Sequence, residues 1–78
     1  MNSRARKVIP LQNFKLKIEF MNGERKIFDV KPLFVYSVYK SIKDNGAFNK
    51  VFISNGIVQW PNEVDICPDR LYDDSVKL

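Results

Sequence analysis

Histidine is absent from the 78-residue sequence, and cysteine occurs once, as Cys67. Without imidazole, the chain lacks the usual general base, the usual proton shuttle and the commonest metal ligand. A single cysteine excludes an internal disulfide, so the chain is not a disulfide-stapled secreted mini-protein, and we expect it to reside in the reducing cytoplasm. We expect no enzymatic activity, no catalytic residues, no cofactor and no metal site.

Long hydrophobic runs are also missing. No apolar stretch approaches the roughly 18 residues that a membrane-spanning helix needs, and the basic N-terminus is not followed by the apolar segment of a signal peptide. Hydrophobic residues make up 45% of the chain and charged residues 28%, proportions typical of a globular protein. We therefore expect one domain over residues 1–78, with an ordered core of about 7–72, tails at 1–6 and 73–78, and no membrane association.

Glycine is scarce, and the spacing of its three positions, 23, 46 and 56, does not form a phosphate-binding loop. Acidic residues gather near the C-terminus, but their spacing does not match a calcium-binding loop, and we interpret them as a solvated face. This group consists of Glu63, Asp65, Asp69, Asp73 and Asp74. The serines and Cys67 have no histidine to activate them, which is why we expect no nucleophilic catalysis.

The clearest secondary-structure signal is the strict alternation of apolar and polar residues over 14–20, which predicts a strand. Asn22-Gly23 predicts a hairpin, with a return strand over 24–30. A two-residue loop would direct Phe28 and Val30 away from the apolar face. We prefer a three-residue loop with Gly23 left-handed, which sets Leu16 opposite Phe28 and Phe14 opposite Val30.

The remaining segments complete an α+β pattern. Residues 7–10 predict a strand at a sheet edge, where a proline is tolerated. Residues 32–43 predict a helix whose apolar stripe consists of Val35, Val38, Tyr39 and Ile42. Valine and tyrosine are poor helix formers, so this helix can be broken into two pieces. Residues 51–54 and 57–60 predict a second hairpin around Asn55-Gly56, and Pro68 opens a last turn. The expected order is β-β-β-α-β-β, a small domain in which antiparallel hairpins flank one short helix.

Charge is distributed unevenly along the chain, whose total is +4. Residues 1–31 carry a net +5, and residues 32–78 carry −1. This asymmetry is consistent with a solvated surface, which we favour, with a self-complementary dimer contact, or with an anionic partner. The candidates for nucleic-acid binding are Arg4, Arg6, Lys7, Lys15 and Lys17. No aromatic residue is expected among them to stack on bases, so only electrostatics favours this function.

Trp60, the only tryptophan, lies at the end of a predicted strand before Pro61. Its ring is expected either to cap the small core or to anchor an interface, and we favour the core because a short chain needs every large side chain for burial.

The closing run from Trp60 to Tyr72, WPNEVDICPDRLY, resembles the final signature of a small bacterial family known as domain of unknown function 2442. Earlier blocks are similar too: Phe20-x-x-Gly23, Phe28-Asp29-Val30-x-Pro32-Leu33 and Phe48-x-x-Val51. Glu63 stands where the family often has glycine. The resemblance implies a compact α+β domain, no established catalytic residues, and frequent genomic pairing with another small protein, as in toxin–antitoxin systems.

Within this run, Trp60, Asn62, Asp65 and Tyr72 are candidates for a structural signature or for partner binding. We expect Asp65 to accept hydrogen bonds from the backbone of the following turn, and Tyr72 to fold back onto the sheet.

Two hypotheses follow. The first is a non-enzymatic protein-binding module that adds a partner's strand, or a second copy of itself, at an open sheet edge. The family resemblance suggests that such a module is the antitoxin-like or regulatory partner of an adjacent-gene product. The alternative is a nucleic-acid-binding protein that uses the basic N-terminal half.

Overall fold

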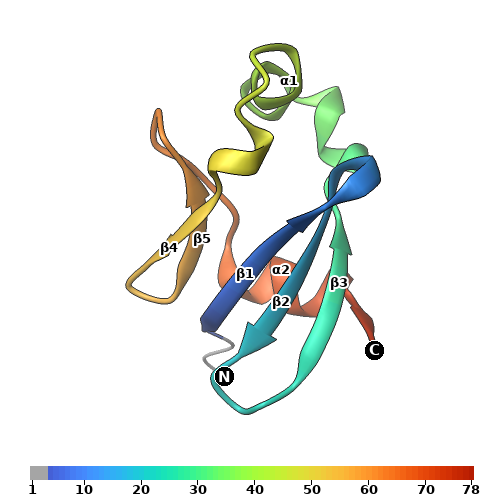
Figure 1. Ribbon diagram of the computed structural model, residues 1–78, viewed down its shortest axis with the longest axis vertical. Helices are drawn as coiled ribbons and strands as arrows, with labels where there is room; N and C mark the ends of the chain where they lie inside the picture. Colours follow the sequence, from blue (N-terminus) through green and yellow to red (C-terminus); the bar gives the residue numbers. More distant parts are fainter. Residues whose placement is uncertain (1–3) are drawn as a thin grey trace.

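Two antiparallel sheets and two helices make up residues 4–78, the part of the chain that the computed structural model describes (Figure 1). The first sheet has the strand order β1-β2-β3-β7 and consists of β1 (Ala5–Leu11), β2 (Lys15–Phe20), β3 (Arg25–Asp29) and β7 (Val76–Lys77). The second has the order β4-β5-β6 and consists of β4 (Phe52–Ser54), β5 (Ile57–Trp60) and β6 (Val64–Asp65). The helices are α1 (Ser37–Asp44) and α2 (Pro68–Asp74). The α+β class is confirmed.

The first hairpin has the register expected from a three-residue loop. Leu16 lies opposite Phe28, and the amide of Phe20 donates to the carbonyl of Glu24 at 2.8 Å. Gly23, with φ +90°, supplies the left-handed residue that closes the turn. The strand itself starts at Lys15 rather than at Phe14, because Phe14 has a φ of 58° and belongs to a 3₁₀ turn over Gln12–Phe14.

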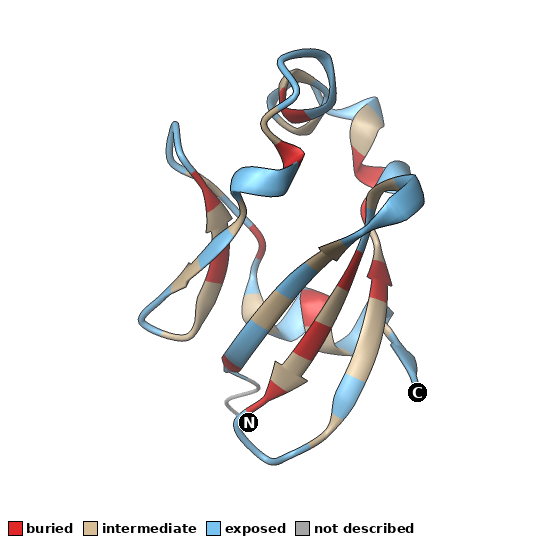
Figure 2. Ribbon diagram, viewed as in Figure 1, coloured by how far each residue is buried: buried red, intermediate tan, exposed pale blue. Residues whose placement is uncertain are grey.

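The core lies between the inner face of the first sheet, helix α2 and the second sheet. On β2, Leu16, Ile18 and Phe20 are completely buried, whereas the alternate residues of the strand are not (Figure 2). Leu71 of α2 and the two buried side chains of β5, Val58 and Trp60, belong to the same apolar cluster. The alternation of the strand therefore determines which of its faces is buried.

The expected helix over 32–43 is divided into two elements. A 3₁₀ helix spans Lys31–Val35, Tyr36 is extended with φ −96° and ψ 132°, and α1 starts at Ser37. Ile42 is buried and Tyr39 is half-buried, but Val35 is 81% exposed and Val38 is 55% exposed. The predicted stripe is therefore wrong for Val35 and Val38. Val35 belongs to the separate 3₁₀ helix, and α1 packs against the core through Tyr39 and Ile42 rather than through Val38.

The second hairpin has the predicted two-residue turn, with Asn55 at φ 55° and Gly56 at φ 78°. Two short strands were not predicted. β6 pairs with β5 after the turn at 61–63, and β7 pairs with β3. Pairs of residues this short carry no alternation signal, so only their partners identify them as strands.

Both expected tails need correction where the structure describes them. Asp73 and Asp74 belong to α2, and Val76 and Lys77 form β7, so 73–78 is not a frayed tail. At the other end, Ala5 is buried and starts β1, while residues 1–3 lie outside the described part of the chain. The observed order is β-β-β-α-β-β-β-α-β, with an additional 3₁₀ turn at Phe48–Lys50.

Candidate functional site

The face of the first sheet that points away from the core combines exposed aliphatic and basic side chains. Because side chains alternate along a strand and the register aligns the neighbours, each outward residue of β2 has outward neighbours on β1 and β3. We call this surface the outer sheet face. It comprises Arg6, Lys7, Ile9, Leu11, Lys15, Lys17, Glu19, Arg25, Ile27, Asp29 and Val76.

The middle row of the outer sheet face is mainly aliphatic. Ile9, Lys17, Ile27 and Val76 lie side by side across the four strands, as their pairing shows. Ile9 is 50% exposed and Val76 is 70% exposed. In the next row, Leu11 lies opposite Lys15, and it too is exposed. Aliphatic side chains that flank a single lysine on a flat sheet are a combination suited to contact with another protein.

The basic residues of the outer sheet face are only partly neutralised. Glu19 lies 3.7 Å from Arg6 and 3.4 Å from Arg25, measured from its carboxylate oxygens to the guanidinium Nε atoms. A bulge between Ala5 and Lys7 brings both Arg6 and Lys7 to the level of Glu19. Within residues 4–78, Lys7, Lys15 and Lys17 form no ion pair. The face therefore keeps an excess of positive charge.

A shallow hollow of about 260 Å³ lies in this face. Lys7, Ile9, Lys17, Glu19 and Arg25 line it. Its size and its mixture of cationic and aliphatic groups suit one acidic or aliphatic side chain of a partner rather than a whole small molecule.

The structure brings together four of the five residues considered for nucleic-acid binding. Arg6, Lys7, Lys15 and Lys17 lie on the outer sheet face, but Arg4 does not. The guanidinium of Arg4 donates to the carbonyl of Asn55 at 2.6 Å, and its side chain covers Gly56, where an added Cβ would lie 2.7 Å from Arg4 Cβ. Arg4 therefore connects β1 to the second hairpin. The outer sheet face contains no aromatic residue for base stacking.

Trp60 is a core residue, with 1% of its surface exposed. Its indole N–H donates to the carbonyl of Phe48 at 2.9 Å, and the Phe48 ring lies 6.2 Å from it between centroids. A side chain enclosed in this way cannot be the anchor of an interface in this conformation. Asn62, the next residue of the signature, is exposed and occupies a left-handed turn with φ 79°.

Asp65 is exposed, and its main-chain carbonyl accepts a hydrogen bond from the hydroxyl of Tyr39 at 2.6 Å. Burial, and then the charge of Asp65, raise the pKa of Tyr39. Helix α2 begins after Cys67 without a side-chain hydrogen bond at its N-cap. Within residues 4–78, the Asp65 carboxylate therefore does not accept the hydrogen bonds that we expected from the following turn, and Asp65 instead accepts one from Tyr39 through its main-chain carbonyl.

Tyr72 attaches α2 to the first hairpin. Its ring packs edge-on against Phe20 at 5.0 Å between centroids, and its hydroxyl donates to the carboxylate of Glu24. The ammonium of Lys26 lies 3.6 Å from the centre of the same ring and donates to the carbonyl of Tyr72 at 3.0 Å. The hydrogen bond from Tyr72 is the main cause that lowers the pKa of Glu24, and the same bond raises the pKa of Tyr72.

Sequence reasoning expected Tyr72 to fold back onto the sheet, which is confirmed, but it missed Glu24 and Lys26. These residues precede Tyr72 by 48 and 46 positions, so no local spacing relates them to it. Only the packing of α2 across the hairpin brings the three together.

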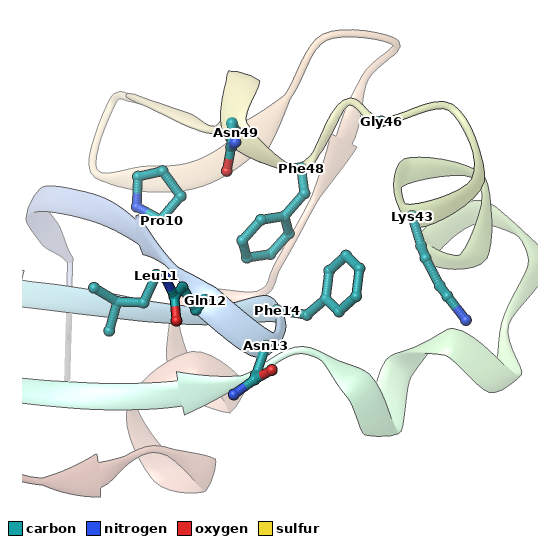
Figure 3. A pocket seen from close by; sticks show the side chains of 9 residues that line it. All are labelled: Pro10, Leu11, Gln12, Asn13, Phe14, Lys43, Gly46, Phe48 and Asn49. Carbon is teal, nitrogen blue, oxygen red and sulfur yellow. The ribbon is translucent and has the colours of Figure 1, made fainter.

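A second hollow, of about 440 Å³, lies between the β1–β2 connection and the loop after α1 (Figure 3). The rings of Phe14 and Phe48 form its wall, with centroids 5.3 Å apart. Asn13 and Phe14 adopt left-handed backbone conformations there. Lys43 is the one ionisable side chain among its lining residues, so the hollow contains no acid–base pair.

Within residues 4–78, no three Cys, Asp or Glu side chains lie close enough together to hold a metal ion. No helix in this part of the chain has the length and hydrophobicity to cross a bilayer.

Comparison with known proteins places nearly the whole chain in one family. A family model described as a protein of unknown function (DUF2442) matches residues 5–77, which confirms the resemblance found in the sequence. No curated protein and no solved structure matches the chain.

Proposed function

Because the chain belongs to the DUF2442 family, whose function is unknown, we propose a function from its own surface: it is a non-enzymatic module that binds another protein. The observation that carries this proposal is the outer sheet face. The aliphatic side chains of Ile9 and Leu11 on β1 and of Val76 on β7 are exposed there, and Ile27 on β3 is half-buried, although the core on the opposite side of the same sheet is completely covered. Exposed aliphatic residues bordered by charge are typical of protein interaction sites.

Charge indicates the chemistry of the partner. The outer sheet face has five basic and two acidic side chains, an excess of three positive charges. Two copies that met through this face would repel each other, whereas a surface with acidic and aliphatic groups would be attracted and would bury Ile9, Ile27 and Val76. An acidic protein is therefore a better occupant than a second copy.

Nucleic acid is the weaker alternative. The lysines of the face would attract phosphates, but the exposed aliphatic residues between them would gain little from contact with a phosphate backbone. In addition, Arg4 is engaged in a structural contact at the second hairpin.

The family resemblance adds a candidate for the partner. In this proposal, the partner is the small protein encoded by the adjacent gene, and the chain acts as its antitoxin-like or regulatory counterpart in the cytoplasm.

The test is co-expression with the adjacent gene, followed by co-purification and calorimetry. Replacing both Lys15 and Lys17 with glutamate should weaken the complex by about 100-fold or more, since like charges at an interface cost several kcal/mol. The matched control replaces Lys40 and Lys50, which are exposed outside this face, and changes the net charge equally.

Equal binding by both double variants would remove the outer sheet face from the proposal, and two proteins that never associate would remove the proposed partner. Retardation of DNA or RNA at low salt by the unaltered chain, lost in the Lys15/Lys17 variant, would favour the nucleic-acid alternative.

A further inference from the structure

The C-terminal strand β7 is a minimal edge strand. It pairs two residues with β3, Lys77 opposite Lys26 and Val76 opposite Ile27, and one further amide, of Leu78, donates to the carbonyl of Arg25 at 3.1 Å. Val76 is 70% exposed and Leu78 is 67% exposed. A strand with so few ladder bonds and so little buried apolar surface opens at low free-energy cost.

The pairing of β7 with β3 includes one pair of like charges. Lys77 lies directly opposite Lys26, and like charges at opposed positions destabilise an antiparallel pair. The two ammonium groups have other partners. Lys26 turns onto the ring and the carbonyl of Tyr72, and Lys77 lies 3.7 Å from the carboxylate of Glu24. The side chains thus avoid each other, and Lys77 complements the charge of Glu24 but not that of Lys26, the residue directly opposite.

β3 is longer than β7 and offers a defined pattern to another strand. It spans five residues, with basic side chains at Arg25 and Lys26 followed by the aliphatic Ile27. A strand with an acidic residue opposite Lys26 and an aliphatic residue opposite Ile27 would replace the like-charged pair with an opposite-charged one. It would also keep the aliphatic contact that Val76 makes.

We propose that the β3 edge is a strand-addition site for an extended, acidic segment of a partner protein, and that β7 occupies this edge until the segment displaces it. Main-chain hydrogen bonds would provide affinity, and the residues opposite Lys26 and Ile27 would provide specificity. Helix α2 would stay in place, because Leu71 is buried in the core and Tyr72 holds the hairpin. This inference builds on the protein-binding function proposed above, but it assigns a sheet edge rather than a face.

The test uses the full chain and two synthetic peptides, Glu-Val-Glu-Val-Glu and its counterpart Lys-Val-Lys-Val-Lys, both blocked at their ends. A Cys67→Ser background carries Ile27→Cys and Val76→Cys, whose opposed positions suit a disulfide that locks β7 onto β3. The same molecule after reduction is the control. We expect the reduced protein to bind the acidic peptide at least about tenfold more tightly than the oxidised protein does, and to bind the basic peptide weakly.

A second measurement does not depend on the disulfide. In an amide NMR titration of the unaltered chain with the acidic peptide, the resonances of 25–29 should shift, and those of 76–78 should move to the positions of an unpaired chain. Equal binding by the locked and reduced forms, equal binding of the two peptides, or shifts confined to other elements would overturn the inference. The co-purification test would be unaffected by such a result, since it concerns the outer sheet face.

Discussion

The two faces of the first sheet differ sharply although they share the same strands. On the inner face of β2, Leu16, Ile18 and Phe20 have no exposed surface. On the outer face, Lys15 is exposed and Lys17 and Glu19 are half-buried between the neighbouring strands. The inner face shows what stabilises the fold, and the outer face is free to carry function, because its residues can change without disturbing the core.

The largest expected effect on stability is at Trp60, a core residue of the second sheet. Trp60→Ala should lower the free energy of unfolding by about 3 to 5 kcal/mol, through lost burial and a cavity. A domain of this size has little more stability than that, so the variant should be unfolded or nearly so in circular dichroism. An unchanged melting temperature combined with lost partner binding would show that Trp60 is part of an interface instead.

The comparison of the two faces is tested most directly by adjacent residues of β2. Leu16→Ala should lower the free energy of unfolding by about 2 to 5 kcal/mol. Lys17→Ala should change it by less than about 0.5 kcal/mol, because surface substitutions have small effects. Urea denaturation of the two variants measures both values. Similar losses in both would mean that the outer face is part of the stabilising structure rather than a free binding surface.

The Tyr72–Glu24 hydrogen bond should make stability depend on pH. The pKa of Glu24 is lowered from 4.5, so its contribution is complete above 4.5 and is lost as the pH falls through the lowered value. The pKa of Tyr72 is raised from 10.0, so its contribution is complete below 10.0 and is lost as the pH rises through the raised value.

Tyr72→Phe should therefore lower the melting temperature between these limits and have less effect beyond them. Tyr36→Phe is the control, because Tyr36 is half exposed. Melting curves from pH 3 to pH 11, a range about one unit or more beyond the two ordinary values, would measure this dependence. Parallel curves for the Tyr72→Phe variant and the unaltered chain over the whole range would contradict the assignment.

The one substitution expected to stabilise the fold lies in the turn between β5 and β6. Glu63 has φ 63°, a left-handed conformation that costs a residue with a side chain about 1 kcal/mol. Glycine adopts this conformation without that cost, as Gly23 does in the first hairpin. Glu63→Gly should raise the free energy of unfolding by about 0.5 to 1 kcal/mol, and Glu63→Ala should give no such gain. Destabilisation by the glycine variant would show that the Glu63 side chain stabilises the turn.

The sequence was most informative where structure depends on neighbours along the chain. The alternation over 14–20, together with Gly23, was enough to predict the register of the first hairpin, and Asn55-Gly56 predicted the second turn. The helix after Pro32 was predicted less well. The sequence allows this helix to be broken into two pieces but does not indicate Tyr36 as the position of the break. The predicted burial of Val35 and Val38 is wrong, because the orientation of α1 depends on its packing rather than on its own pattern.

The candidate surfaces show the same division. The basic residues of β2 can be identified from the sequence, but the rows of the outer sheet face follow only from the register of all four strands. The sequence grouped Arg4 with these basic residues, whereas in the structure its side chain binds the second hairpin. Strand β7 could not be predicted from the sequence, because two residues are too few to show the alternation of apolar and polar residues. They form a strand only because β3 pairs with them.

The hairpins, the α+β class and the family can all be predicted from the sequence, since they depend on patterns between near neighbours in the chain. The contacts of Tyr72 with Glu24 and Lys26, the enclosure of Trp60 beside Phe48 and the position of Lys77 opposite Lys26 are seen only in the folded molecule. They could not be predicted because packing joins residues that are distant along the chain, and no local pattern specifies which distant residues will meet.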